Sequence, residues 1–280
     1  MKLANVNDRA VVVTGSGGID VAMASNGRFG PDVQSLYDDW AAFRSFAAGL
    51  DDAAAVPVDA ARLGSPAPRP RQVFAIGLNY RLHALESGMD IPSVPVVFTK
   101  FPASLSGPFS DIERAGDTVD WEVELVVVIG ERCDRTSEAD AWSHVAGLTV
   151  GQDISERTMQ MLAGRQFSMG KSYRGFGPMG PWLVTPDDVA NPDDLGLGCS
   201  IDGVEMQNSR TGDLIFSVPQ LIARMSAILP LLPGDVIFTG TPSGVGNARK
   251  PPRFLQVGEV LETWIEDIGT IRNRVVAPSA

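Results

Sequence analysis

The amino-acid sequence predicts an α+β protein that is mostly β, with a small N-terminal α+β domain at residues 1–70 and a larger domain at residues 71–280. Three observations support this. Short apolar runs alternate with Pro/Gly turns through the larger part, which is typical of a β-rich domain with few helices. Segment 64–71 contains three prolines, so it favours an extended linker over a helix. Strand-like and helical patterns both precede that linker.

In the N-terminal part, strands are expected at 10–14 and 19–25, joined by a Gly-rich turn at 15–18. This turn resembles the phosphate-binding loop of dinucleotide-binding proteins. However, Asp20 stands where that fingerprint requires its third glycine, and the pattern after it is strand-like instead of helical. We therefore expect a β-hairpin. Apolar residues at helical spacing over 31–50 predict an amphipathic helix that follows the hairpin.

The larger domain is expected to contain five strands and three short helices. Ser137 and Ser217 are suitable N-caps for two of these helices. Strands are expected at 73–78, 94–99, 121–129, 148–153 and 235–239, and helices at 137–144, 155–163 and 217–229.

The overall charge restricts the classes of partner. The 280 residues carry a formal net charge of −11, which repels phosphate backbones and anionic lipids, so we expect neither a nucleic acid nor a membrane as partner. The two cysteines, Cys133 and Cys199, show no CxxC spacing. Neither a signal-peptide pattern nor an apolar run of about 20 residues occurs. A reduced cytoplasmic protein is expected.

Two acidic residues, Glu122 and Glu124, interrupt the apolar run at 121–129. Alternate side chains of a strand share one face, so the two carboxylates are expected side by side. A divalent cation would offset their repulsion, because hard cations prefer carboxylate oxygens. A strand edge with both side chains in water is the alternative that this pair alone leaves open.

A third carboxylate, Asp153, follows the next apolar strand and precedes a predicted helix. Arg157 and Gln160 lie three residues apart on that helix and therefore on one face. A metal ligand, a cation and an amide would then converge, which suits binding of a carboxylate and a neighbouring carbonyl oxygen. A simple helix cap at Asp153 is the alternative explanation.

His83 and Glu86 are spaced i, i+3, so on a short helix the carboxylate can orient the imidazole and raise its basicity. The only other histidine, His144, lies in a sequence typical of a packing position. His83 is therefore the candidate general base, although single histidines are more often structural.

Two further segments carry polar groups suited to an anion. Lys171 in Gly-Lys-Ser could offset the charge of an oxyanion, although most lysines lie on the solvated surface. The loop at 239–246 could present backbone N–H groups and the Thr241 hydroxyl to a carboxylate. It is neither a Walker loop nor a nucleophile elbow, because the residue order differs from both.

Taken in order along the chain, these motifs resemble the fumarylacetoacetate hydrolase superfamily. The motifs are Gly-Leu-Asn-Tyr-x-x-His-x-x-Glu, Glu-x-Glu, Asp-x-Ser-x-Arg-x-x-Gln, Gly-Lys-Ser and Thr-Gly-Thr-Pro-x-Gly-Val-Gly. The resemblance runs from about residue 72 to the C-terminus and includes Asp-Leu-Ile-Phe-Ser-Val-Pro at 213–219 and Pro-Gly-Asp-Val-Ile at 233–237. Bacterial acylpyruvate hydrolases and 2-hydroxyhepta-2,4-diene-1,7-dioate isomerases are the members that it is most similar to.

The resemblance implies a mixed β-sandwich roll behind a small N-terminal domain, a homodimer, and one Mg²⁺ or Mn²⁺ ion, with Ca²⁺ as a further option. It also implies a small anionic 2-oxo acid as substrate. Carried over by position, the metal ligands would be Glu122, Glu124 and Asp153. The catalytic residues would be His83, Glu86 and Lys171, and the substrate would contact Arg157, Gln160, Thr241, Gly240, Tyr80 and Lys100.

One position departs from the family pattern: Leu82 stands where many bacterial relatives have an aspartate before the histidine. His83 would then be oriented by Glu86 alone, or its loop would be more mobile. The His/Glu pair favours hydrolysis of an acylpyruvate by an activated water. Decarboxylation of oxaloacetate, isomerisation of a 2-oxo acid and a non-catalytic ligand-binding role stay open.

Overall fold

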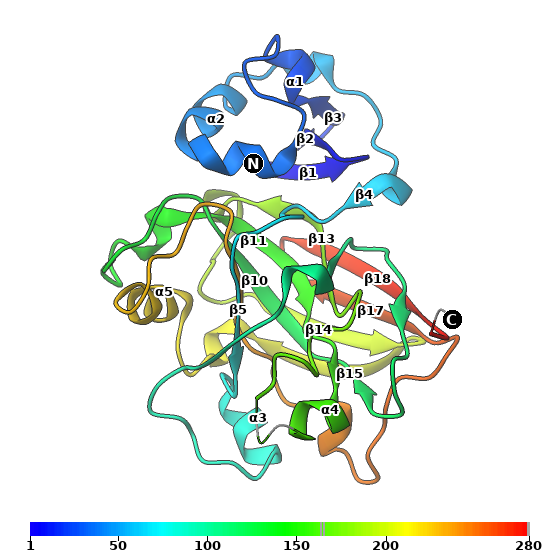
Figure 1. The fold of residues 1–280 in the computed structure, drawn as a ribbon. Helices are drawn as coiled ribbons and strands as arrows, with labels where there is room; N and C mark the ends of the chain where they lie inside the picture. Colours follow the sequence, from blue (N-terminus) through cyan, green and yellow to red (C-terminus); the bar gives the residue numbers. More distant parts are fainter. Residues whose placement is uncertain (163, 165, 279–280) are drawn as a thin grey trace.

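The computed structural model describes residues 1–162, 164 and 166–278 (Figure 1). The strands are β1 Lys2–Val6, β2 Arg9–Thr14, β3 Gly17–Asp20, β4 Leu63–Gly64, β5 Val73–Gly77, β6 Val96–Thr99, β7 Leu105–Ser106, β8 Ile112–Glu113, β9 Val119–Asp120, β10 Val123–Ile129, β11 Val145–Gln152, β12 Ser155–Glu156, β13 Gly177–Val184, β14 Gly196–Ile201, β15 Val204–Arg210, β16 Val236–Phe238, β17 Val260–Ile265 and β18 Gly269–Val276. The α-helices are α1 Val21–Ala24, α2 Trp40–Ala47, α3 Arg81–Glu86, α4 Arg157–Leu162 and α5 Val218–Ser226. The 3₁₀ helices are Val33–Asp39, Asp52–Ala54, Ala60–Arg62, Pro102–Ser104, Ala141–His144, Pro186–Asp188, Thr211–Asp213 and Gly246–Ala248.

Two sheets form the body of the molecule. The larger has 11 strands, with the central order β3-β2-β1-β13-β11-β10-β16-β5-β6. The smaller has five strands in the order β15-β14-β17-β18-β8. In Figure 1 the two sheets lie against each other below the N-terminal segment, and α3 and α4 lie at the end of the molecule farthest from that segment. The predicted α+β, mostly β architecture is confirmed.

Strand β10 is buried on both faces, which explains its unbroken apolar sequence. Leu125 and Val127 belong to the core between the two sheets. Val126 and Val128 point the other way, into a second core that contains Trp40 of α2. Side chains of a strand alternate between faces, so one strand contributes to both cores. This double burial fixes the position of Glu122 and Glu124 at the start of the strand.

The N-terminal hairpin is confirmed, since β2 and β3 pair antiparallel across the glycine turn. The expected strand at 19–25 is wrong beyond Asp20, because the Asp20 side chain accepts a hydrogen bond from the Met23 N–H and so begins α1. The expected helix at 31–50 is two helices, a 3₁₀ turn and then α2. The Asp39 side chain caps α2 by accepting from the Ala42 N–H.

The expected strands of the larger domain correspond to β5, β6, β10, β11 and β16. The helix expected at 155–163 begins instead as strand β12, which pairs with β9, before α4 starts. Its expected last residue lies outside the described part of the chain.

The helix expected at 137–144 is shorter than predicted, because the Ser137 hydroxyl bonds the Asp140 carboxylate in a turn before the 3₁₀ helix Ala141–His144. The cap expected at Ser217 is present in α5 as a full capping box with Gln220.

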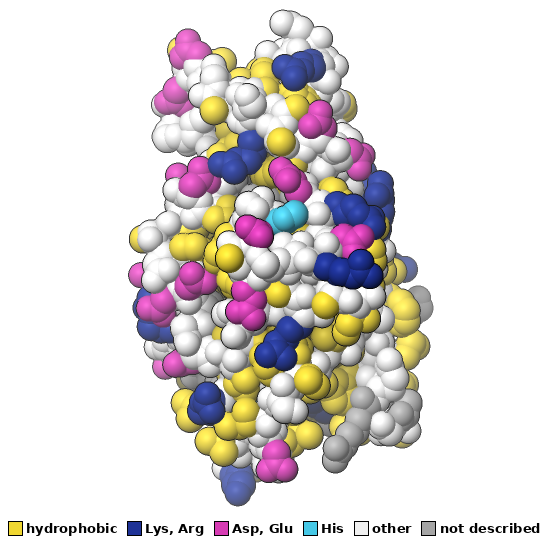
Figure 2. Space-filling model, turned by 90° about the vertical axis from the view of Figure 1, so that its left-hand side faces the viewer, with side chains coloured by type: hydrophobic (Ala, Val, Ile, Leu, Met, Phe, Trp, Pro, Cys, Tyr) yellow, Lys and Arg dark blue, Asp and Glu magenta, His cyan; other side chains and the backbone are white. Residues whose placement is uncertain are grey.

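The N-terminal strands extend the larger sheet, because β1 pairs with β13 and also with β4. The division of the chain near residue 70 stays a prediction. None of the helices in the described residues is long and apolar enough to span a membrane. Charged side chains of both signs are interspersed with apolar ones over the face in Figure 2, so the net negative charge is not concentrated in one area of that face.

Candidate active site

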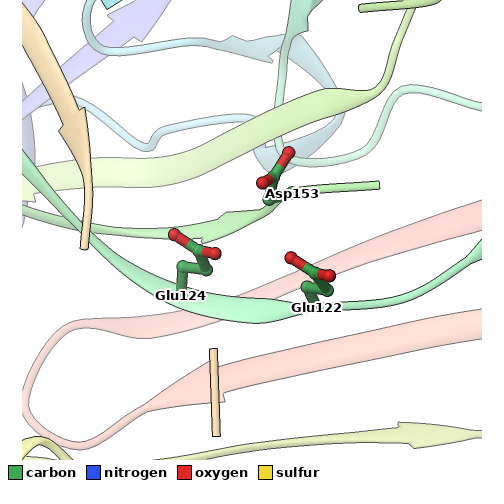
Figure 3. Close-up of side chains that lie close together, drawn as sticks. All are labelled: Glu122, Glu124 and Asp153. Atoms are coloured by element: carbon green, nitrogen blue, oxygen red, sulfur yellow. The ribbon is translucent and has the colours of Figure 1, made fainter. Parts of the chain in front are cut away.

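Three buried carboxylates lie together where β10 begins and β11 ends. The ligand atoms of Glu122, Glu124 and Asp153 lie within 4.8 Å of one another. Figure 3 shows them facing a common space, with Glu124 on β10, Glu122 one residue before that strand and Asp153 one residue after β11. The antiparallel register produces this meeting, because the Asp153 N–H donates to the Glu122 carbonyl at 3.0 Å. The expected side-by-side placement of the two glutamates is therefore present.

Three cations surround this carboxylate cluster. The Lys171 ammonium lies 2.7 Å from Glu122 Oε2 and 2.5 Å from Asp153 Oδ2. Lys100 is fully buried, and its ammonium lies 2.7 Å from Asp153 Oδ1 and also donates to the Lys171 carbonyl. The Arg157 guanidinium reaches Glu122 Oε1 at 2.7 Å. Glu122 and Asp153 are thus paired with cations on several sides.

Glu124 differs from the other two carboxylates, because it accepts a hydrogen bond from a backbone group, the Gly240 N–H, which donates to Oε2 at 2.8 Å. Burial and the neighbouring Asp153 and Glu122 charges raise its pKa well above the usual range. For Glu122, burial also raises the pKa, but Lys171 and Arg157 outweigh this and lower it to about 2. Glu124 is therefore the carboxylate of the three whose charge the protein offsets least, and its neutral form is favoured.

This donor set fits a divalent metal. All three side chains offer hard oxygen atoms, which Mg²⁺, Mn²⁺ and Ca²⁺ prefer. A cation held by Glu122, Glu124 and Asp153 would favour the charged form of Glu124, whose pKa is raised by its two acidic neighbours.

The His83–Glu86 pair is formed on helix α3, as the spacing predicts. His83 Nδ1 lies 2.8 Å from Glu86 Oε1, and the histidine is 8% exposed. The Gly244 N–H donates to both oxygens of the Glu86 carboxylate, at 3.1 Å to Oε1 and 2.9 Å to Oε2. Leu82, where the family pattern has aspartate, is 62% exposed and points to the surface. Among the described residues, Glu86 is the carboxylate that orients His83.

The loop that follows β16 does bind carboxylates through its N–H groups, but these carboxylates belong to the chain itself. Gly240 donates to Glu124 and Gly244 to Glu86. The N–H groups of Gly246 and Asn247 donate to Asp120, at 2.7 and 2.9 Å. The loop therefore supports the carboxylates of the site, where the sequence predicted a direct role toward the substrate.

A cavity of about 720 Å³ brings these groups together. Most of the predicted site residues line it: His83, Glu86, Glu122, Arg157, Gln160, Lys171 and Thr241. Asp153 and Glu124 lie behind this wall, and so do Gly240, Lys100 and Tyr80. Lys100 and Gly240 contact metal-ligand candidates, whereas the buried Tyr80 hydroxyl has no hydrogen-bond partner in the described residues.

Sequence reasoning missed two buried polar residues. Asp120 is fully buried and accepts from Arg157 Nε at 2.8 Å. Gln207 donates to Thr241 Oγ1 at 2.8 Å and accepts from the Val123 N–H at 2.9 Å. Strand alternation could have revealed Asp120, which precedes Glu122 by two residues and so shares its face. Nothing in the local sequence marks Gln207.

Two cations of the cavity wall, Arg249 and Lys250, were also missed. They follow the glycine-rich loop, and the sequence offers no periodic signal for a loop residue that faces a cavity.

Comparison with solved structures places this geometry among related folds. A crystal structure from Mycobacterium smegmatis, described as an HpcE candidate, is 52% identical with a TM-score of 0.94, and all of both chains is covered. Maleylpyruvate hydrolase from Sphingobium sp. SYK-6, solved with manganese(II) and pyruvate, is 29% identical with a TM-score of 0.81, and again all of both chains is covered.

Curated relatives agree with the structural comparison. The 2,4-didehydro-3-deoxy-L-rhamnonate hydrolase of Sphingomonas sp. (strain SKA58) is 46% identical over 217 residues, 76% of each chain. The mitochondrial oxaloacetate tautomerase FAHD2A of Bos taurus is 44% identical over 215 residues, 76% of this chain and 68% of that protein. A family model described as fumarylacetoacetate (FAA) hydrolase C-terminal matches residues 72–276, and the chain therefore belongs to the fumarylacetoacetate hydrolase family.

Proposed function

We propose that this protein is a divalent-metal-dependent hydrolase that cleaves a carbon–carbon bond in a small acylpyruvate, a 2,4-dioxo acid. The observation that carries the proposal is the His83–Glu86 pair on the wall of the cavity that Glu122 and Lys171 also line. A base, a metal-binding cluster and a buried ammonium then share one space. Each of these three groups can serve a step in the hydrolysis of a 1,3-dicarbonyl compound.

The metal would be Mg²⁺ or Mn²⁺ held by Glu122, Glu124 and Asp153, and when bound it would act as a Lewis acid toward substrate oxygen atoms. Manganese in the related maleylpyruvate hydrolase supports this assignment. Arg157, Gln160 and Thr241 would bind the carboxylate and 2-oxo group of the substrate from the cavity wall.

The acid–base step is assigned to the His83–Glu86 pair. The Glu86 carboxylate can only accept a hydrogen bond, so the hydrogen of the neutral imidazole lies on Nδ1. The other ring nitrogen, Nε2, is then free to take a proton from water. The water oxygen bonds to C4 of the substrate and the C3–C4 bond breaks, which releases a carboxylic acid and the enolate of pyruvate. His83 then returns its proton to C3, and the Lys171 ammonium offsets the charge on the oxyanion.

A second candidate is a tautomerase or isomerase of a 2-oxo acid. It is favoured by the 44% identity to the bovine oxaloacetate tautomerase, and the same His83–Glu86 pair could move a proton between carbon and oxygen without any attacking water. Decarboxylation of oxaloacetate would likewise need no attacking water. A homodimer in the cytoplasm is part of the proposal, as the resemblance and the composition predicted.

The test is an assay of the purified protein with Mn²⁺ or Mg²⁺ on acetylpyruvate and oxaloacetate in parallel, with an EDTA control. Metal-dependent release of acetate and pyruvate would establish hydrolysis. Loss of carbon dioxide from oxaloacetate alone would assign a decarboxylase, and an accelerated keto–enol exchange alone would assign a tautomerase. Either of these last two outcomes would overturn the hydrolase proposal.

A further inference from the structure

The Gln207 side chain contacts the cavity wall from behind. Gln207 lies on β15 in the smaller sheet, is 2% exposed and does not line the cavity. Thr241, in the glycine-rich loop after β16, does line it. The Gln207 amide donates a hydrogen bond of 2.8 Å to the Thr241 hydroxyl oxygen. A buried residue of the smaller sheet is therefore in direct contact with a polar group of the cavity wall.

The neighbours of the Gln207 amide determine which way it points. Its oxygen accepts from the Val123 N–H at 2.9 Å, and a backbone N–H can only donate. Its nitrogen donates to the Pro242 carbonyl at 2.8 Å, and a carbonyl oxygen can only accept. The group that faces the Thr241 hydroxyl is therefore the NH₂ group, which has no acceptor capacity.

This orientation determines what the Thr241 hydroxyl can offer. Its oxygen already accepts from Gln207, and within the described part of the chain the hydroxyl donates to no acceptor. The hydroxyl hydrogen is thus directed away from Gln207 and is available to a group in the cavity. Thr239 provides a contrast, because its fully buried hydroxyl donates to the Leu125 carbonyl at 2.9 Å. The hydrogen of Thr239 is used within the protein, and that of Thr241 is not.

The same amide connects Thr241 to the strand of the candidate metal ligands. Val123, whose N–H donates to Gln207, stands between the two glutamates of the carboxylate cluster in the sequence. Gly240, the residue before Thr241, donates to Glu124. Gln207 therefore fixes the position of the hydroxyl relative to the carboxylate cluster, where the metal and the 2-oxo acid are proposed to bind.

We propose that Gln207 is a positioning residue for substrate binding, whose amide directs the Thr241 hydroxyl as a donor toward an anionic oxygen of the substrate. This inference rests on the proposed function, which places the carboxylate or 2-oxo group of the substrate at Thr241. Gln207 itself does not touch the substrate. The site then selects, at this position, for an oxygen atom that accepts a hydrogen bond.

The test uses pyruvate, which has no 4-oxo group and so cannot be cleaved. Its dissociation constant is measured by isothermal titration calorimetry with the full chain saturated with Mn²⁺. Thr241→Val removes the hydroxyl and is expected to weaken pyruvate binding at least about 10-fold, the effect of one hydrogen bond to a charged group. Thr241→Ser keeps the hydroxyl and should retain most of the affinity.

Gln207→Glu keeps the shape of the side chain and an acceptor for the Val123 N–H. Its carboxylate can only accept, so it draws the Thr241 hydrogen toward itself, and pyruvate should bind at least about 10-fold more weakly. The added charge acts with or without the hydroxyl, so the double variant with Thr241→Val isolates the hydrogen bond. Its loss of affinity should be smaller than the product of the two single losses. The affinity for Mn²⁺ should not fall in any of these variants, whereas a general loss of structure would lower it.

Gln207→Met adds no charge, so it gives a reading even if burial of a carboxylate impairs folding. It leaves the Thr241 hydroxyl free among the staggered orientations, so pyruvate should bind about threefold more weakly. Two matched controls lie outside the cavity wall. Thr263→Val removes a buried hydroxyl that accepts from Gln152 Nε2 at 2.9 Å, and Gln220→Glu keeps its contact with the Ser217 N–H in the capping box. Both controls should bind pyruvate like the wild type.

Wild-type affinity for pyruvate in both Gln207→Glu and Gln207→Met would overturn the proposal. So would losses in Gln207→Glu and Thr241→Val that simply multiply in the double variant, or failure of the wild-type protein to bind pyruvate. These measurements do not depend on turnover. If the two residues are coupled in this way while 2,4-dioxo acids are not hydrolysed, the positioning role stands and the hydrolase assignment fails.

Discussion

Asp120 and Glu122 hold the two sides of one guanidinium, that of Arg157. Arg157 Nε donates to Asp120 Oδ2 at 2.8 Å, and its Nη1 lies 2.7 Å from Glu122 Oε1. The same Asp120 carboxylate accepts from the N–H groups of Gly246 and Asn247. Asp120 therefore fixes Arg157 relative to both the carboxylate cluster and the loop that holds Glu86.

Asp120→Asn should destabilise the fold strongly, because it leaves the buried Arg157 with one anionic partner fewer. Loss of one member of a buried ion pair costs about 3–5 kcal/mol. The quantity to measure is the free energy of unfolding, from urea denaturation of both proteins with EDTA present. The control is Asp117→Asn, since Asp117 is 93% exposed in its pair with Arg114 and such pairs contribute about 0–1 kcal/mol. Similar losses in the two variants would contradict the central role of Asp120.

Glu124→Gln should abolish metal binding and activity together, because it removes a ligand charge from the triad. Removal of a residue that merely orients a metal ligand lowers metal affinity by about 10–100-fold. Removal of a ligand charge should therefore lower the affinity for Mn²⁺ by at least about 100-fold. Titration calorimetry with Mn²⁺ measures this affinity. Glu138→Gln, at an exposed position, should bind Mn²⁺ like the wild type. Full activity of the metal-stripped Glu124 variant would refute the metal assignment.

His83→Ala should lose acylpyruvate hydrolysis and keep its metal affinity, because His83 is not one of the three clustered carboxylates. Loss of a general base typically lowers kcat by about 10²–10⁴-fold. The measurement is release of pyruvate from acetylpyruvate, and His144→Gln serves as the control at the other histidine. A His83 variant that hydrolyses at the wild-type rate would show that another group activates the water.

Lys171→Met should lower kcat without weakening metal binding. The ammonium lies against Glu122 and Asp153, so its removal cannot reduce their attraction for a cation. Loss of one group that stabilises an oxyanion costs about 10²–10³-fold in kcat. Lys2→Met, outside the cavity wall, is the control. An unchanged kcat would leave Lys171 with a purely structural role.

The Arg9–Asp20 pair predicts a pH-dependent contribution to stability. The hydrogen bond from Arg9 lowers the pKa of Asp20, so the carboxylate is favoured more in the folded than in the unfolded state. This contribution is present above the unfolded pKa of about 3.9 and is lost as the pH falls through the lower folded value. Asp20→Asn should therefore reduce the free energy of unfolding at pH 7, by up to about 1 kcal/mol, and much less at pH 2. An equal effect of the substitution at both pH values would exclude this ion pair as its cause.

The sequence by itself determined the features that depend on neighbours along the chain. Strand alternation places Glu122 and Glu124 together, and the i, i+3 spacing joins His83 to Glu86 and Arg157 to Gln160. Such relationships follow from the regular geometry of strands and helices, so they can be predicted without knowledge of the fold.

Only the tertiary structure decided which distant groups meet these local pairs. The β10–β11 register brings Asp153 opposite Glu122, and the packing of the chain places the Lys171 ammonium between those two carboxylates. The loop N–H groups at Gly240 and Gly244 bind Glu124 and Glu86 across more than 100 residues of sequence. Contacts of this range depend on strand register and on the burial of whole elements, which no local pattern of side chains encodes.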